Sequence, residues 1–205
     1  MKTFVTLVFS LLIVFNSFSQ VIETKYDSGS MRSIGELKNN KKEGIWKFYY
    51  PDGTLQAFEN YSKDELNGEA LSYDFEGNLQ SRELWKNGSL EDTATYYYPN
   101  KRIKRKGIYK NGQYEGLWID YYPTGVVKRT LEYRFGQPNG EWKYYSENGV
   151  LMQKGAYKSG LETGPWEFYS KKGKLQFKGE YSNGEKVGNW VRIKSGKEKP
   201  YEYKN

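Results

Sequence analysis

The 205-residue chain contains neither cysteine nor histidine. Without cysteine, no disulfide can hold the fold together and no thiol can act as a nucleophile, so stability must come from burial and backbone pairing. Without histidine, the usual general base of enzymes and a frequent metal ligand are missing. Most hydrolase and metalloenzyme mechanisms are therefore left without support. We expect a protein that is not an enzyme and that has no catalytic residue, metal site or cofactor.

Long apolar runs are also scarce, and the N-terminus holds the clearest one. The run from Phe4 to Phe15 is interrupted by two polar residues and follows the positive charge of Lys2. A membrane-spanning helix needs about 20 apolar residues, whereas a short run between a positive start and small residues is typical of a secretory signal peptide. We predict that residues 1–19 are a signal peptide cleaved after Ser19. The protein would then be exported to the periplasm, the cell surface or the medium, without a transmembrane span.

The chain is rich in aromatic residues and glycine, with 20 Tyr, 10 Phe, 6 Trp and 22 Gly. These residues recur with a spacing of 24: the stretch GEWKYY at Gly140 returns as GPWEFY at Gly164, and the next step reaches Gly188. Backward steps lead to Gly44, which begins the first complete unit, and no insertion interrupts the series. Self-similarity at one fixed period is the signature of a repeat architecture.

Two columns of the repeat are aromatic in every unit, and a third, the tryptophan column, is aromatic in most units. The third position is Trp46, Trp118, Trp142, Trp166 and Trp190; the sixth is Tyr49, Tyr73, Tyr97, Tyr121, Tyr145 and Tyr169; the eighteenth is Tyr61, Trp85, Tyr109, Tyr133, Tyr157 and Tyr181. A residue that recurs in each unit has the same role in each unit, and packing is the role that all units share. We therefore interpret these columns as structural, rather than as a platform for sugar rings.

Each unit has the pattern of a β-hairpin, since two runs of aromatic and β-branched residues are separated by turns such as PDG, PTG and KNG. We predict an all-β fold: an elongated, open antiparallel sheet of tandem 24-residue hairpins. Residues 44–187 would form six repeats, residues 20–43 a degenerate N-terminal repeat or cap, and residues 188–205 a C-terminal partial repeat or cap. Trp166 and Tyr169 are three residues apart, which sends them to opposite faces of a flat strand unless a bulge intervenes.

The repeat pattern GxWxFYxxxGxLxxxGxYxNGxxxG resembles the MORN-type repeat in its bacterial variant form, over nearly the whole chain after the signal peptide. The resemblance implies an elongated, twisted sheet of hairpins and a role as a scaffold or interaction module, and some bacterial members carry an antitoxin label. The third unit departs from the pattern, with Asp92, Ala94 and Lys101 in place of Gly, Trp and Gly. The second unit has Ala70 in its tryptophan column, which puts local packing in question.

The divergent third unit also holds the densest positive charge, the stretch KRIKRK at residues 101–106. Strand alternation places Arg102, Lys104 and Lys106 on one face and sends the remaining three residues to the other. The first three are the candidate surface for an anionic partner, although a charge run on a strand is also typical of a solvated face. Export argues against nucleic acid as that partner.

These observations favour an exported, non-enzymatic repeat protein that acts as a binding or scaffolding surface for another protein or a component of the cell envelope. Two alternatives stay open. One is a glycan- or polyanion-binding module of the envelope, and the other is an antitoxin or immunity-type protein, which only the resemblance suggests.

Overall fold

The computed structural model describes residues 18–202, which form one sheet of 17 strands; no helix occurs within this range. The strands are β1 (Ser19–Lys25), β2 (Met31–Lys38), β3 (Lys41–Tyr49), β4 (Leu55–Ser62), β5 (Glu65–Tyr73), β6 (Leu79–Lys86), β7 (Ser89–Leu90), β8 (Asp92–Tyr97), β9 (Ile103–Lys110), β10 (Gln113–Tyr121), β11 (Val127–Arg134), β12 (Gln137–Tyr145), β13 (Leu151–Lys158), β14 (Leu161–Tyr169), β15 (Leu175–Ser182), β16 (Glu185–Lys194) and β17 (Lys197–Pro200). The predicted signal peptide, except for Phe18 and Ser19, lies outside the described residues.

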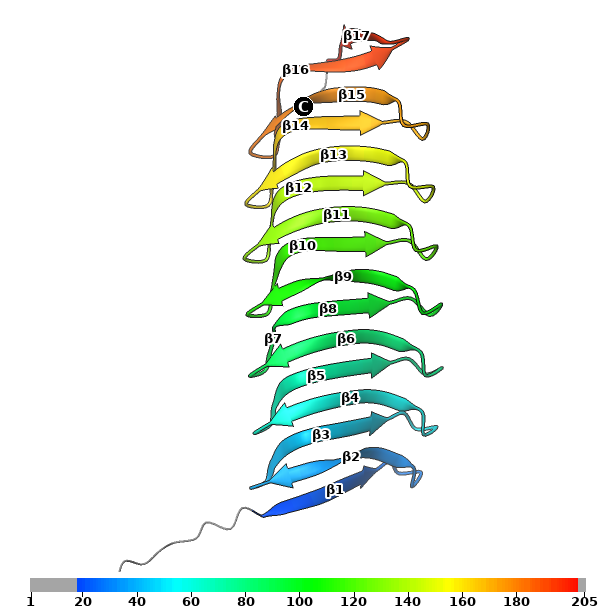
Figure 1. Ribbon diagram of the computed structural model, residues 1–205, viewed down its shortest axis with the longest axis vertical. Helices are drawn as coiled ribbons and strands as arrows, with labels where there is room; N and C mark the ends of the chain where they lie inside the picture. The colour runs from blue at the N-terminus through cyan, green and yellow to red at the C-terminus, as the bar shows by residue number, and fades with distance from the viewer. Residues whose placement is uncertain (1–17, 203–205) are drawn as a thin grey trace, which may run out of the picture.

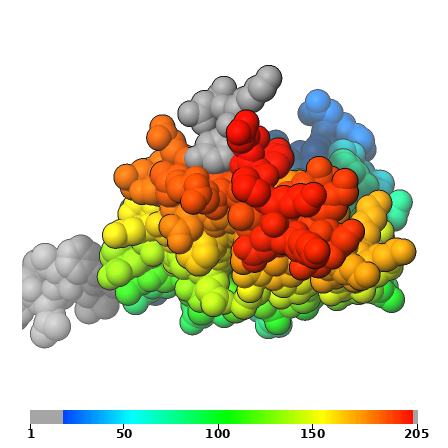
Figure 2. All heavy atoms as spheres, turned by 90° about the horizontal axis from the view of Figure 1, so that it is seen from above, coloured from blue at the N-terminus to red at the C-terminus, as the bar shows by residue number. Residues whose placement is uncertain are grey.

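The strands follow one another along the sheet in chain order, and neighbouring strands pair antiparallel. The sheet is therefore an open stack of hairpins, with β1 at one end and β17 at the other (Figure 1). Seen along the stack, each unit covers the one behind it (Figure 2). The predicted fold class, an open antiparallel sheet of tandem hairpins, is confirmed.

The third unit departs from the others as its sequence indicated. Its first strand is divided into β7 and β8, and β6 pairs with both. Asp92 begins β8 with φ of 68°, in the left-handed region where Gly44 and Gly116 stand in the equivalent place with φ of 66° and 64°. Aspartate is one of the few residues that adopt this conformation at modest cost. The backbone bend thus survives the loss of glycine, and the repeat stays in register.

A β-bulge beside the turn of each hairpin answers the question left open for the tryptophan and tyrosine columns. The register of β10 with β11 shifts between Asp120 and Tyr121, and that of β14 with β15 shifts between Phe168 and Tyr169. Asp120 pairs with Arg129 and Tyr121 with Val127, so the extra residue of the bulge is Lys128 on the second strand, β11. Lys128 and Arg129, although adjacent in sequence, both line the same hollow, as do Asp120 and Tyr121.

The core of this single-layer sheet contains a series of tryptophan rings, four of which lie on a glycine of the preceding hairpin. Trp46, Trp118, Trp166 and Trp190 are only 3–4% exposed. A Cβ atom on the glycine beneath each ring would stand 2.2–2.3 Å from it, at Gly35, Gly107, Gly155 and Gly179 respectively. No larger side chain fits below these four rings, so glycine at these four positions is required by packing and not by backbone conformation. Trp142 is the exception, because it lies opposite Leu131, which is 6% exposed, and its own ring is less deeply buried. We call this side of the sheet the Trp face.

Where a unit lacks tryptophan, the hairpin before it has lost the facing glycine. Ala70 lies opposite Glu59, and Ala94 is 1% exposed on β8, whose neighbour β6 carries Glu83 in the glycine column. The carboxylate of Glu59 accepts a hydrogen bond of 2.6 Å from the Tyr61 hydroxyl. A carboxylate side chain above alanine therefore takes the place of an indole ring above glycine, which answers the question of packing in these units.

Candidate functional site

A ladder of cross-strand neighbours runs along the Trp face, perpendicular to the strands. It joins the fifth position of each hairpin to the fourteenth position of the same hairpin and to that of the preceding hairpin. The residues in these two columns vary from unit to unit. Its members in spatial order are Ser33, Phe48, Ala57, Ser72, Ser81, Tyr96, Arg105, Asp120, Arg129, Tyr144, Gln153, Phe168, Phe177 and Arg192. Three charged residues therefore stand side by side in the middle of a ladder that is otherwise uncharged apart from its last member.

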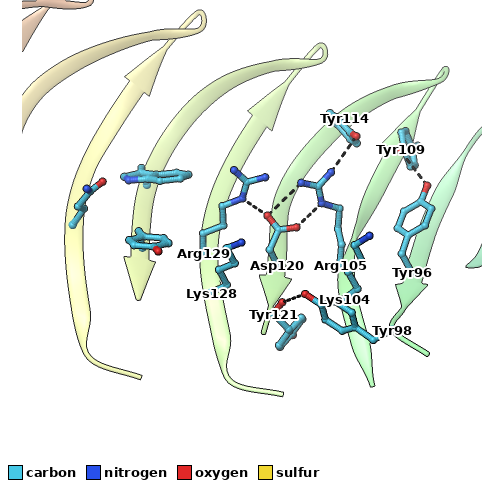
Figure 3. Close-up of a pocket in the computed structure, with 13 residues that line it drawn as sticks. Tyr96, Tyr98, Lys104, Arg105, Tyr109, Tyr114, Asp120, Tyr121, Lys128 and Arg129 are labelled. Carbon is cyan, nitrogen blue, oxygen red and sulfur yellow. Dashed lines mark hydrogen bonds and ion pairs between the residues drawn. The ribbon is translucent and has the colours of Figure 1, made fainter. Parts of the chain in front are cut away.

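Asp120 on β10 lies directly opposite Arg105 on β9 and Arg129 on β11. The Arg105 Nε donates to Asp120 Oδ1 at 2.5 Å, its Nη2 lies 3.3 Å from Oδ2, and the Arg129 Nε donates to Oδ2 as well. The Asp120 side chain is 16% exposed, against 30% for Arg105 and 35% for Arg129. One carboxylate thus holds two guanidinium groups that still reach solvent (Figure 3).

Arg105, Asp120 and Arg129 form a triad of charges that stabilise one another. Burial opposes ionisation of Asp120, but the hydrogen bonds and attraction from Arg105 and Arg129 outweigh it and hold the pKa of the carboxyl below its usual value. The pKa of Arg105 is raised, chiefly by its hydrogen bond to Asp120. Both partners are therefore fully charged at neutral pH, and the triad carries a net positive charge.

The triad lies in a hollow of about 760 Å³ whose lining combines cations with aromatic rings. Lys104 and Lys128 add two ammonium groups beside the two guanidinium groups, and Asp120 is the one carboxylate in the lining. The aromatic members of the lining are Tyr96, Tyr98, Tyr109, Tyr114, Tyr121, Trp142 and Tyr144. Such a hollow suits an anionic group that also offers surface for contact with rings.

Aromatic packing beside the triad makes one wall of the hollow rigid. The Tyr114 ring lies 4.4 Å from Trp118, 5.0 Å from Tyr133 and 5.1 Å from Tyr109, measured between ring centroids. The Tyr96 and Tyr109 hydroxyl oxygens are 3.2 Å apart. Burial is the main cause that raises the pKa of Tyr109 to about 12. These hydroxyls therefore stay protonated and serve as neutral hydrogen-bonding groups.

The residues predicted to form the anionic-partner surface are separated by the fold. Lys104 lines the hollow, with its Nζ 5.9 Å from the Tyr98 ring. The Arg102 side chain at the preceding turn instead donates to the Thr124 carbonyl oxygen. The Lys106 Nζ lies 5.9 Å from the Tyr121 ring and is outside the lining.

Sequence reasoning did not identify Arg105, Asp120, Lys128 and Arg129 as a site. Arg105 was assigned to the face away from the candidate surface, and the other three stand in the next unit. The sequence does contain one indication of this site: Asp120 is the single carboxylate among the fifth-position residues of the units. Recognising it requires knowledge of which columns face each other across strands. Three residues of the predicted structural columns, Tyr109, Tyr121 and Trp142, also line the hollow.

Residues 18–202 contain neither a membrane-spanning helix nor a cluster of metal ligands. Within them, no helix has the length and apolar character to cross a membrane. The same part of the chain brings together no group of three or more His, Cys, Asp and Glu side chains that could hold a metal ion.

The family model described as "MORN repeat variant" matches residues 42–63, 66–87, 93–111, 114–134, 138–159 and 162–183. No curated protein matches the sequence. Among solved structures, a porin-like protein from Bacteroides uniformis ATCC 8492 is 11% identical, with 89% of this chain and 93% of that chain covered and a TM-score of 0.20. A TM-score this low carries no argument about fold or function.

Proposed function

Since this chain belongs to the MORN repeat variant family, we propose that it is an exported, non-enzymatic protein that presents the Trp face of its sheet to a partner protein. Tandem hairpins build a long, regular surface in which each unit offers the same framework and a few variable positions. The ladder of fifth and fourteenth positions supplies those variable positions here. A surface of this kind is suited to binding and scaffolding.

One observation carries the proposal: three of the four charged residues of the ladder, Arg105, Asp120 and Arg129, are gathered in a single hollow. Four cations, from Lys104, Arg105, Lys128 and Arg129, surround one carboxylate, so four minus one leaves an excess of three positive charges. A protein does not gain stability from such an excess, because like charges on neighbouring strands repel. Its benefit comes when an acidic group of a partner enters and forms charge-assisted hydrogen bonds.

The proposed binding is tested by affinity capture from the cell envelope fraction of the producing organism, with residues 20–205 as bait. Lys104→Glu/Lys128→Glu reverses two charges in the hollow, and both lysines are exposed, so the fold should be retained. Lys171→Glu/Lys172→Glu, in the exposed turn before β15, makes the same charge change elsewhere. We expect one envelope protein to be recovered by the natural chain and the turn variant but lost with the hollow variant. Equal recovery by all three would refute a role for the hollow.

Export is proposed from the pattern of Lys2, the apolar run from Phe4 to Phe15 and the small residues up to Ser19. The test is cell fractionation of the full-length chain followed by N-terminal sequencing. We expect the protein outside the cytoplasm with Gln20 as its first residue. Recovery of the unprocessed chain from the cytoplasm would contradict this part of the proposal.

A glycan or polyanion is the second candidate ligand, because the same cations would attract sulfate, phosphate or uronate groups. Heparin chromatography separates the two. Retention that is lost in Lys104→Glu/Lys128→Glu, without any captured protein, would favour the polyanion. The third possibility, an antitoxin or immunity role, predicts that the captured protein is toxic when produced alone.

A further inference from the structure

The hollow contains the same pair of cations twice, one repeat apart. Lys104 and Arg105 on β9 occupy the thirteenth and fourteenth positions of their unit, and Lys128 and Arg129 on β11 occupy the same positions of the next. Their surroundings repeat as well. The Arg105 and Arg129 guanidinium carbons lie 5.8 and 5.9 Å from a tryptophan ring of the following hairpin, and the Lys104 and Lys128 Nζ atoms lie 5.9 and 5.6 Å from a tyrosine ring.

The distance between the two pairs follows from sheet geometry. Adjacent strands are about 4.7–4.9 Å apart, so equivalent residues on β9 and β11 are separated by about 9.4–9.8 Å along the sheet. The strand between them, β10, contributes Asp120, which holds the Nε of both arginines (Figure 3). The site is therefore a pair of cation clusters with a fixed spacing, and its axis runs along the stack of hairpins.

Asp120 leaves donors free for a ligand. Within the described residues, the Arg129 Nη1 and Nη2 have no hydrogen-bond partner, while Arg105 Nη1 has only the Tyr114 hydroxyl at 3.5 Å. Asp120 engages Nε and Nη2 of Arg105 but only Nε of Arg129, so it orients both groups and leaves the two terminal nitrogens of Arg129 available to a ligand. Asp120 acts here as a positioning residue, and the ligand must supply carboxylates or similar anions.

A polypeptide in polyproline II conformation matches this spacing. It has three residues per turn and rises about 3.1 Å per residue, so every third side chain points the same way at intervals of about 9.3 Å. An extended β-strand fits poorly, because residues on one of its faces are about 6.8 Å apart. The tyrosines Tyr96, Tyr98, Tyr121 and Tyr144 that line the hollow also favour this form, since aromatic-lined grooves are a recurring way to bind polyproline II segments.

We propose that the hollow binds a segment of its partner protein in polyproline II conformation, with an acidic residue at every third position. One carboxylate contacts Lys104 and Arg105, and the carboxylate three residues away contacts Lys128 and Arg129. The segment lies across the strands, along the ladder. This inference rests on the proposed function, since it specifies which part of a partner protein the hollow recognises.

The test measures binding of synthetic peptides to residues 20–205 by fluorescence anisotropy at fixed salt. The probe is a peptide of repeated Glu-Pro-Pro triplets, and its control has the same composition with the glutamates grouped together. A third peptide forms an α-helix with glutamates seven residues apart, about 10.5 Å along the helix. We expect the triplet peptide to bind with a dissociation constant at least about tenfold lower than that of either other peptide.

Two variants assign the binding to the hollow. Lys104→Gln/Lys128→Gln is expected to weaken binding of the triplet peptide at least about tenfold, while Lys171→Gln/Lys172→Gln leaves it unchanged. Arg129→Gln removes the unpartnered donors and retains the ion pair of Arg105 with Asp120; it is expected to weaken binding to a similar degree. Circular dichroism confirms that each variant keeps its sheet.

Three outcomes would overturn the inference. Equal binding of the triplet and grouped peptides would mean that charge alone is recognised, and tighter binding of the helical peptide would mean that a helix is the ligand form. Binding of heparin with no binding of any peptide would assign the hollow to a glycan. The first two outcomes leave the proposed function intact, because capture of a partner protein and its loss in the hollow variant are measured separately.

Discussion

The contact between Gly155 and Trp166 makes a prediction that distinguishes packing from backbone conformation. The φ angle of Gly155 is not positive, so alanine is compatible with its backbone. Its Cβ, however, would lie 2.2 Å from two atoms of the Trp166 ring, where ordinary contacts are 3.4–4 Å. The ring is 4% exposed and cannot move by more than an ångström without disturbing its neighbours. Overpacking of this kind costs about 1–3 kcal/mol.

The expected result reverses when the ring is absent. Trp166→Ala alone should lower the free energy of unfolding by about 3–5 kcal/mol, the usual loss for a buried aromatic ring. In that background Gly155→Ala meets no ring, and alanine in a strand is favoured over glycine by roughly 0.5–1 kcal/mol. Gly155→Ala should therefore destabilise the natural chain and stabilise the Trp166→Ala variant. Adding the two effects gives a coupling energy of about 1.5–4 kcal/mol between the sites.

Urea unfolding followed by far-ultraviolet circular dichroism measures all four proteins of this cycle, and avoids tryptophan fluorescence because the mutation removes a fluorophore. Gly160→Ala is the matched control, since its φ is +85° and no atom lies within 4 Å of the added Cβ. Its cost, about 1–2 kcal/mol from backbone strain, should be the same with and without Trp166. If Gly155→Ala behaves like this control, glycine in the column is not required by the ring and the packing argument fails.

Three further perturbations follow from the same structure. Ala70→Trp alone should destabilise the protein by about 1–3 kcal/mol because the new ring meets Glu59. Adding Glu59→Gly should restore most of this loss, which the midpoints of urea unfolding would show. If stability does not recover, the two columns do not face each other as described. Asp120→Asn should cost about 1–3 kcal/mol at neutral pH, because the two guanidinium groups lose the negative charge and one of the two acceptor oxygens. Because the folded pKa of Asp120 lies below its usual value, this advantage of the natural chain should disappear as the pH falls through the folded value. An advantage independent of pH would exclude the ion pairs as its source. Tyr109 and Tyr157, with pKa values of about 12, favour the protonated form in the folded state, so stability should decline as the pH rises from about 10 toward 12. Ultraviolet titration checks this, and full ionisation near pH 10 in the folded protein would refute it.

The repeat and its hairpins were predictable because they depend on local properties. The 24-residue period, the alternation of side chains and the turns rich in Gly and Asn are all written within one unit. At the turn between β6 and β7, for example, Asn87 and Gly88 both have positive φ, 49° and 75°, as a tight hairpin turn requires. The family pattern was likewise visible in the columns of tryptophan, tyrosine and glycine.

The glutamates that compensate for alanine in the tryptophan column are present in the sequence, but the sequence does not show which residues they face. Ala70 follows Glu59 by eleven residues, and nothing in one dimension shows that the two face each other. The structure shows that the pair replaces an indole and a glycine. Asp92 raised a similar question, and its left-handed backbone shows that the bend of the missing glycine is kept.

Local sequence thus determined what each hairpin is, and the tertiary structure determined which side chains meet between hairpins. KRIKRK, the stretch with the densest positive charge, suggested a site at Arg102, Lys104 and Lys106. The sheet instead joins Arg105 to Asp120 and Arg129, fifteen and twenty-four residues away. The physical reason is cross-strand register. A bulge of one residue in each hairpin decides which positions stand opposite one another, and that register is set by contacts between strands that no single strand encodes.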